Sequence, residues 1–292
     1  MNVEQPLTTP RIKAQLQEWL TEDLGRGDLT APALCGRRAQ ASWIAKHDGV
    51  FCGGELALQL FRLLDPQLEA DRPVVDGSAV QVGDTLLRLD GQATALVGAE
   101  RTALNLAMRL SGIATATAEL VNQLRGSGVR LADTRKTTPG LRELEKYAVR
   151  MGGGVNHRLG LDDAAMLKEN HLAWAGGVKP AIAAVRASAP WPARVIVEAE
   201  TEQEAIEAVM AGADGVLLDE FTPEQLSMLV PRLRLLAIER AGSGAVVLEA
   251  SGIQPGDLRA YAATGIDLIS TSAPVTRSRW LDLSMRFAPA GG

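Results

Sequence analysis

The pattern of apolar and polar residues changes character near Ser111-Gly112. Before that point, one amphipathic helix begins at Pro10 and another covers Ala99–Leu110. Between them lie short alternating segments separated by glycines, a spacing typical of tight antiparallel turns, with a further helix expected over Glu55–Leu64. The first part of the chain therefore predicts helices combined with antiparallel strands.

After Gly112, short apolar strands alternate with helices, which is the pattern of parallel βα units. The strands are expected at Val129–Asp133, Ala164–Lys168, Arg194–Glu198, Gly215–Asp219, Ala245–Glu249 and Asp267–Thr271. The helices are expected at Pro139–Arg150, Val178–Ala187, Glu202–Ala211, Pro223–Glu239 and Pro255–Ala263. Six such units are too few for the usual eight-stranded barrel. The pattern leaves a smaller or incomplete barrel and an open doubly wound sheet as the two architectures.

Composition narrows the class of protein. The chain has 292 residues, is 46% hydrophobic and carries a formal net charge of -5, so nucleic acid and anionic membranes are poor candidates as partners. Its two cysteines, Cys35 and Cys52, have neither metal-ligand spacing nor a disulfide framework. No apolar signal region or membrane-spanning run is present. These features predict a soluble protein of the cytoplasm.

One segment of this acidic chain, Asp133–His171, gathers several basic side chains. It holds two of the three histidines and several arginines and lysines, with three glycines at 152–154 where a helix is expected to stop. These basic side chains predict a site for an anionic small molecule. The basic groups that stand out are Arg135, Lys136, His157, Arg158, Lys168 and His171.

Polar residues also follow the predicted parallel strands at their carboxyl ends, the edge that carries the chemistry in parallel α/β folds. They are Asp133, Lys168, Glu198, Asp219, Glu249 and Ser270. Each alone could cap a helix or form a surface ion pair, and Lys168 could instead be a Schiff-base lysine. Ser251-Gly252 and Ser270–Ser272, in neighbouring loops, indicate a phosphate site.

Several motifs resemble those of the quinolinate phosphoribosyltransferases. The most specific is DTRKTTPGLRELEKYAVRMGGGVNHRLGL, which begins at Asp133 and is followed by LKENH at 167–171. Shorter matches are ERTALNLAMRLSGIAT at 100–115, LLDEF at 217–221 and LEASGI at 248–253. The resemblance extends over nearly the whole chain.

The resemblance implies an N-terminal α/β sandwich domain (1–111), an incomplete parallel α/β barrel (112–275) and a tail (276–292) that packs back on the first domain. It implies transfer of phosphoribose from phosphoribosyl pyrophosphate to quinolinate with decarboxylation, giving nicotinate mononucleotide for NAD synthesis. It also implies a homodimer, or a hexamer built from such dimers, in which Arg101 reaches the neighbouring subunit's site. The helical pattern alone places Arg101 on a solvated face.

The same resemblance assigns roles to individual positions. The groups expected to bind the two carboxylates of quinolinate are Arg101, Arg135, His157 and Arg158, with Thr134 and Lys136 lining the pocket. Those expected to face phosphoribosyl pyrophosphate are Lys168, Glu198 and Asp219, the two carboxylates acting through Mg²⁺. With Lys136, these three are the expected catalytic residues. Ser251, Gly252, Ile253 and Ser272 are expected to hold the 5′-phosphate.

Three positions depart from the family pattern. Glu220 stands where asparagine is usual, Ile253 where a polar residue or glycine is usual, and Ser272 where glycine is common. Three other functions stay open: a phosphoribosyltransferase with a different anionic acceptor, a Schiff-base lyase using Lys168, and a non-catalytic binder of phosphate ligands. Three arginines favour a dicarboxylate over a monocarboxylate acceptor.

Overall fold

The chain forms two compact units in a computed structural model that describes residues 9–241, 246–254 and 256–288. The first unit comprises the described parts of 1–116, 150–153 and 278–292, and the second comprises 117–149 and 154–277. The first unit thus takes four residues from the middle of the chain as well as its C-terminal segment. No helix in the described part of the chain is long and apolar enough to cross a membrane.

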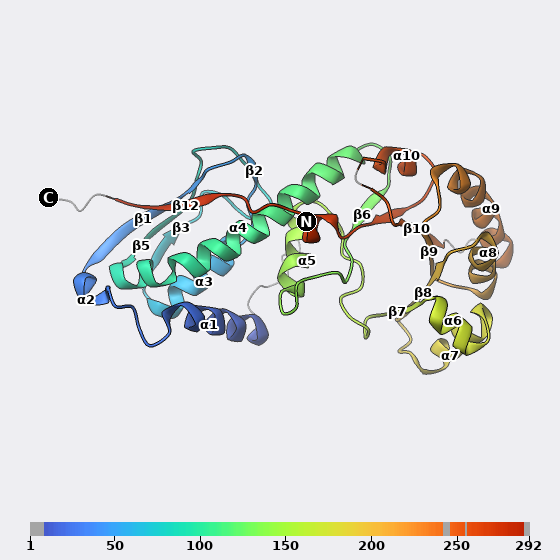
Figure 1. The fold of residues 1–292 in the computed structure, drawn as a ribbon, viewed down its shortest axis with the longest axis horizontal. Coiled ribbons are helices and arrows are strands. Elements are labelled where there is room, and N and C mark those ends of the chain that lie inside the picture. The colour runs from blue at the N-terminus through green and yellow to red at the C-terminus, as the bar shows by residue number, and fades with distance from the viewer. Residues whose placement is uncertain (1–8, 242–245, 255, 289–292) are drawn as a thin grey trace. The chain divides into compact units, whose positions relative to one another are not determined.

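The first unit is built on an antiparallel sheet with the strand order β12-β1-β5-β3. Figure 1 shows helices on one side of this sheet. Inside the core, the rings of Trp43 and Phe61 meet edge to face at 6.2 Å. The strands are β1 (Arg38–Ala45), β2 (Gly49–Val50), β3 (Glu69–Asp71), β4 (Ala79–Val80), β5 (Thr85–Gln92) and β12 (Leu283–Phe287). The helices are α1 (Pro10–Leu24), α2 (Ala31–Leu34), α3 (Gly54–Leu64) and α4 (Ala93–Gln123), whose last turns enter the second unit.

The second unit is built on a parallel six-stranded sheet with the order β6-β11-β10-β9-β8-β7. From β7 to β11, each strand lies beside the next one in the chain, and β11 then pairs with β6. Among the described residues, only the β6–β7 pairing that would close a barrel is missing. A doubly wound sheet would reverse its strand order. The architecture is therefore an incomplete barrel, and the doubly wound alternative is wrong.

The strands of this sheet match the expected segments closely. They are β6 (Arg130–Ala132), β7 (Ala164–Leu167), β8 (Arg194–Ala199), β9 (Gly215–Asp219), β10 (Val247–Ser251) and β11 (Leu268–Ser270). The helices are α5 (Arg142–Met151), α6 (Glu169–Ala175), α7 (Val178–Ser188), α8 (Glu202–Ala211), α9 (Pro223–Ala241), α10 (Leu258–Ala262) and α11 (Ala273–Thr276). The expected starts of one strand and one helix, Ala245 and Pro255, lie outside the described residues.

Alternation along the strands separates the helix-facing core from the site. In β8, Val195, Val197 and Ala199 are buried in the apolar cluster that also contains residues of α7, α8 and α9, whereas Glu198 points to the other face. α8 starts at a capping box in which Thr201 and Glu204 satisfy each other's backbone N–H groups. The helices thus cover one face and leave polar side chains on the other.

α4 runs through Ser111-Gly112 without a break, whereas the sequence pattern ended this helix at Leu110. Ser111 Oγ accepts a hydrogen bond from the backbone N–H of Cys52 at 2.9 Å and donates to its carbonyl at 3.0 Å. A β-carbon on Gly112 would lie 2.0 Å from the carbonyl oxygen of Arg279. Both residues are therefore small because other segments of the first unit pack against this helix.

Candidate active site

The register of the parallel strands brings distant polar residues onto one surface. Glu198 and Glu249 both pair with Leu217 from opposite sides, and Asp219 pairs with Ser251 two residues further along. These positions surround a pocket of about 530 Å³ in the second unit. The predicted site residues that line it are Thr134, Arg135, Lys136, His157, Arg158, Lys168, Glu198, Asp219, Ser251, Gly252, Ile253 and Ser272.

Among the residues to which the family resemblance assigns a role, Arg101 alone does not line this pocket. It is exposed on α4 in the first unit. Its expected role depends on a second copy of the chain, so this position neither supports nor contradicts that role.

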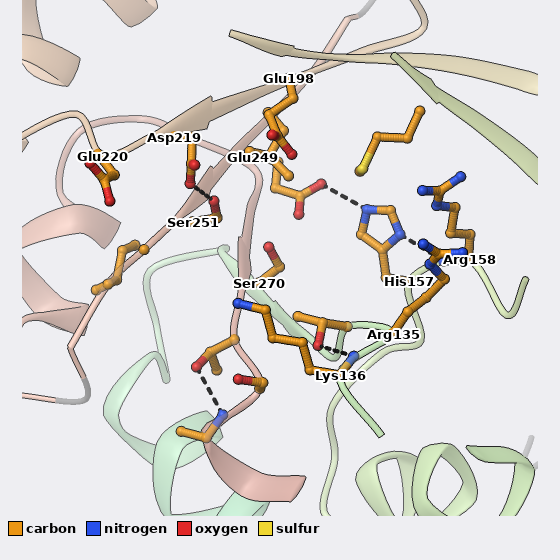
Figure 2. Close-up of a pocket in the computed structure, with 18 of the residues that line it drawn as sticks. Arg135, Lys136, His157, Arg158, Glu198, Asp219, Glu220, Glu249, Ser251 and Ser270 are labelled. Carbon is orange, nitrogen blue, oxygen red and sulfur yellow. Dashed lines mark hydrogen bonds and ion pairs between the residues drawn. The ribbon is translucent and has the colours of Figure 1, made fainter. Parts of the chain in front are cut away.

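The basic side of the pocket is formed by the loops after β6 and before β7 (Figure 2). Arg158 is half-buried, and its guanidinium donates to the carbonyl of Ala164 at 3.1 Å. Burial lowers the pKa of Arg158, and the positive charge of nearby Arg135 lowers it further. Two guanidinium groups that repel each other in a partly buried wall favour an anionic ligand between them.

A buried ion pair supports this wall from behind. Lys146 and Asp133 are each 1% exposed and bonded to each other. Asp133 also accepts from the backbone N–H of His157 at 2.8 Å and from the Asn156 side chain at 2.6 Å. Lys146 donates to the carbonyl of His157 at 3.0 Å. The pair therefore ties α5 and the end of β6 to the loop that carries the basic side chains.

The position of Asp133 corrects the expectation that it is a polar group of the rim, because it is buried beneath the pocket and does not line it. Burial raises the pKa of Asp133 and lowers that of Lys146, and their mutual contact opposes both shifts. Lys146 was not predicted. The signal that could have suggested Lys146 is its position on α5: it is a charged residue next to Tyr147, in a stretch of the helix that is otherwise rich in apolar residues.

His157 makes hydrogen bonds through both ring nitrogens. The backbone N–H of Arg158 donates to Nδ1 at 2.7 Å, and Nε2 lies 3.2 Å from a carboxylate oxygen of Glu249 (Figure 2). The other histidine of the basic segment, His171, does not line the pocket and instead accepts from the backbone N–H of Lys168 at 3.1 Å at the start of α6.

The acidic side of the pocket carries carboxylates from two neighbouring strands. Glu198 is paired with Lys168, and Asp219 accepts a hydrogen bond from the Ser251 hydroxyl. Glu220 follows at a φ of 59°, the only left-handed backbone position among the described non-glycine residues. Glu220 also lines the pocket, so this side of it carries the carboxylates of Glu198, Asp219 and Glu220.

The loops after β10 and β11 form the remaining wall. Gly252 has a φ of 77°, and a β-carbon there would lie 3.5 Å from Glu220 Cγ, so the left-handed turn rather than space demands glycine. Ile253 contributes to the pocket but is 7% exposed and belongs to the core cluster, so its side chain anchors the loop. Further lining residues were not predicted, and those with long side chains among them include Met166, Gln254 and Arg277. Met166 could have been found two residues before Lys168 on β7, whereas no periodic signal marks the other two.

Comparison with known proteins gives one consistent result. Residues 28–111 match the family model of the quinolinate phosphoribosyl transferase N-terminal domain, and residues 113–286 match that of the C-terminal domain. A probable carboxylating nicotinate-nucleotide pyrophosphorylase of Synechocystis sp. is 43% identical over 277 residues, which is 94% of this chain and 92% of the relative. The carboxylating nicotinate-nucleotide pyrophosphorylase of Mycobacterium leprae is 40% identical over 91% of this chain and 93% of its own.

Solved structures agree with these matches. The nicotinate-nucleotide pyrophosphorylase from Francisella tularensis superposes with a TM-score of 0.87 at 35% identity, covering 98% of this chain and 100% of that one. The enzyme from Ehrlichia chaffeensis gives a TM-score of 0.83 at 28% identity, covering 94% and 98%. The similarity therefore includes both units and is not confined to the barrel.

Proposed function

Because this chain belongs to the quinolinate phosphoribosyl transferase family, we propose that its pocket transfers phosphoribose from phosphoribosyl pyrophosphate to quinolinate, releasing pyrophosphate and CO₂ and giving nicotinate mononucleotide. The observation that supports this most directly is the division of one pocket into a guanidinium side and a carboxylate side. A planar dianion and a ribosyl pyrophosphate need these two kinds of partner next to each other.

Arg135 and Arg158 are the groups that would hold the two carboxylates of quinolinate. Guanidinium groups stay charged when half-buried and bind carboxylates through two parallel hydrogen bonds. Thr134 and Lys136 lie on the same side, and the Thr134 hydroxyl accepts from the backbone N–H of Lys136 at 3.0 Å, which shapes the loop. A monocarboxylate acceptor would leave one guanidinium without a partner.

On the other side, Glu198 and Asp219 would hold Mg²⁺ and ribose hydroxyls. No group of three metal-binding side chains of His, Cys, Asp or Glu occurs among the described residues. Mg²⁺ does not need one, because it is commonly bound by one or two carboxylates together with substrate phosphates and water. Oxygen ligands at these two strand ends fit that requirement, and the bound ion would neutralise charge on the leaving pyrophosphate.

The chain's own residues would act by positioning and electrostatics, with no nucleophilic side chain. The pyridine nitrogen displaces pyrophosphate at C1 of the ribose. The 2-carboxylate then leaves as CO₂, and the electron pair left at C2 is stabilised by the ring's new positive charge until C2 takes up a proton. Lys136 and Lys168 supply positive charge around the anionic substrates. The 5′-phosphate would be held by Ser251, Gly252 and Ser272 with the Ile253 backbone.

Lys168 does not favour the Schiff-base alternative. Its ammonium group is paired with Glu198, whereas an imine-forming lysine must be neutral to attack a carbonyl.

The assay that tests the proposed function supplies quinolinate, phosphoribosyl pyrophosphate and Mg²⁺ and follows CO₂ release with nicotinate mononucleotide formation. Product formation with nicotinate but not with quinolinate would contradict it.

We further propose that the active form is a homodimer, or an assembly of such dimers, in which Arg101 completes the partner's acceptor site. Two inactive variants test this, Arg101→Ala and Arg135→Ala. In a mixed dimer one site keeps both arginines, so random mixing should restore about a quarter of the normal activity. No recovery in demonstrably mixed dimers would contradict the sharing of Arg101.

A further inference from the structure

Glu249, on β10, is a buried acidic residue of the pocket to which the family resemblance gave no role. Its side chain is 4% exposed, and one oxygen, Oε2, lies 3.2 Å from Nε2 of His157. The other oxygen, Oε1, is buried and has no hydrogen-bond partner among the described residues. Because Glu249 lines the pocket, this unpaired oxygen lies at the wall that a substrate would meet.

Asp133 shows what a purely structural carboxylate looks like in the same unit. Both of its oxygens are satisfied, one by Lys146 and the His157 N–H and the other by Asn156. A buried carboxylate oxygen without a donor is costly, and native proteins rarely keep one without a reason. Glu249 therefore differs from the structural case because one oxygen lacks a donor that a ligand can supply.

The hydrogen bonds of the His157 ring define the role of Glu249 Oε2. Since the backbone N–H of Arg158 donates to Nδ1, that nitrogen carries a lone pair and the ring proton sits on Nε2. Nε2 then donates to Glu249. The imidazole is held as one neutral tautomer with both nitrogens in use, so His157 offers no N–H to a substrate carboxylate in this arrangement.

The chemistry of the two substrates decides which one can donate a hydrogen bond to Glu249 Oε1. The quinolinate dianion has a ring nitrogen and two carboxylates, all of them acceptors, and so has no donor for a carboxylate. Phosphoribosyl pyrophosphate carries two ribosyl hydroxyls, which are donors. Glu249 also lies level with Glu198 across the sheet, with Leu217 between them. It therefore stands between the ribosyl side of the pocket and the acceptor side (Figure 2).

We propose that Glu249 joins the two halves of the site: Oε1 accepts a hydrogen bond from a ribosyl hydroxyl, while Oε2 positions His157 in the acceptor wall. This inference rests on the proposed function. It makes Glu249 a determinant of specificity for ribosyl over deoxyribosyl substrates, and it makes His157 a wall residue whose ring is fixed rather than a direct ligand of quinolinate.

Two variants separate the two contacts. Glu249→Gln keeps an amide oxygen for His157 but loses the negative charge toward the hydroxyl, so KM for phosphoribosyl pyrophosphate should rise while KM for quinolinate changes little. Glu249→Ala loses both contacts, so both KM values should rise. A hydrogen bond to a charged group corresponds to a change of about 10- to 100-fold. The matched control is Glu200→Gln, which makes the same carboxylate-to-amide change at an exposed residue that does not line the pocket. This variant should behave as the wild type.

A binding measurement tests the hydroxyl contact without chemistry. Ribose 5-phosphate and its 2-deoxy and 3-deoxy analogues are compared as competitive inhibitors of the wild type and of Glu249→Ala. The wild type should bind at least one deoxy analogue about 10-fold more weakly than ribose 5-phosphate, and the variant should lose that preference. Thermal unfolding of both variants confirms that they fold.

Three results would overturn the proposal. The first is a folded Glu249→Ala enzyme with wild-type KM values, and the second is a preference for ribose 5-phosphate over both deoxy analogues that survives in that variant. The third is a nitrogen-15 spectrum of the free enzyme that shows the His157 proton on Nδ1. An enzyme that makes no product from quinolinate would instead refute the proposed function, so the two failures are distinguishable.

Discussion

Replacement of Glu220 by asparagine is expected to stabilise the protein. Glu220 follows β9 with a φ of 59°, where a side chain with a β-carbon is strained. Asparagine enters this left-handed region more readily than other non-glycine residues, because its short polar side chain can hydrogen-bond locally. Glutamate at this position therefore carries a backbone cost that asparagine would lower. Gly252 lies next to it, since a β-carbon there would be 3.5 Å from Glu220 Cγ.

The size of the effect follows from the cost of the backbone conformation. A non-glycine residue in the left-handed region costs about 1–2 kcal/mol, of which asparagine should recover about 0.5–1 kcal/mol. For a unit of roughly 150–250 residues, each kcal/mol shifts Tm by about 2–4 °C. The Glu220→Asn variant should therefore unfold about 1–4 °C higher than the wild type.

Scanning calorimetry measures the shift, and Glu220→Gln is the matched control. Glutamine removes the charge but keeps the length and the unfavourable backbone, so Glu220→Gln should change Tm less than Glu220→Asn does. Equal shifts in both variants would show that charge repulsion beside Asp219, rather than backbone strain, is the cause. A lower Tm for Glu220→Asn would refute the reasoning outright.

The same pair of variants reports on the charge of the pocket. Glu220 lines it beside Asp219, where an anionic pyrophosphate is expected. Two unit charges about 8 Å apart repel by about 0.5 kcal/mol in water and more near protein, so both variants should lower KM for phosphoribosyl pyrophosphate by about 2- to 5-fold. An increase in KM accompanied by a higher Mg²⁺ requirement would show that Glu220 itself helps to bind the metal.

Three further single variants and one double variant test the remaining parts of the site. Arg135→Ala should abolish quinolinate binding in calorimetric titration with unchanged Tm, and normal turnover would contradict its role. Asp219→Ala should lose activity at ordinary Mg²⁺, and an unchanged Mg²⁺ dependence would exclude it as a metal-side group. Lys146→Met should destabilise the protein by about 3–5 kcal/mol because it leaves Asp133 as an unpaired buried charge. Adding Asp133→Asn should recover part of that loss in denaturant unfolding, and no recovery would contradict the ion-pair explanation.

Much of the second unit could be predicted from sequence because its strands are short apolar runs bounded by glycine, proline or charged residues. β9 begins and ends at the residues expected, Gly215 and Asp219, and α8 does the same at Glu202 and Ala211. The first unit was harder, because Ser111-Gly112 has the composition of a helix end. Small residues stand at these two positions because Cys52 and Arg279 pack against α4 there. A local pattern cannot reveal contacts with residues so distant in the sequence.

The site was predictable to the extent that it depends on where parallel strands end. Lys168 follows β7, Asp219 ends β9 and Glu198 is the last residue but one of β8. Parallel pairing alone brings them to one edge. Asp133 obeys the same rule yet is buried, because α5 supplies Lys146 beneath it. Whether a strand-end carboxylate faces a ligand or a buried partner depends on the helix that follows, and the strand itself carries no sign of it.

The acceptor wall shows why such buried partners matter for function. His157 is held from behind through its backbone, by Asp133 and Lys146, and from the pocket through its ring, by Glu249. Guanidinium charge is assured by chemistry, but two forked donors bind a planar dianion only if their loop is held still. The binding energy of the arginines therefore depends on carboxylates that never touch quinolinate. Any change that releases this loop should weaken acceptor binding even when every arginine remains.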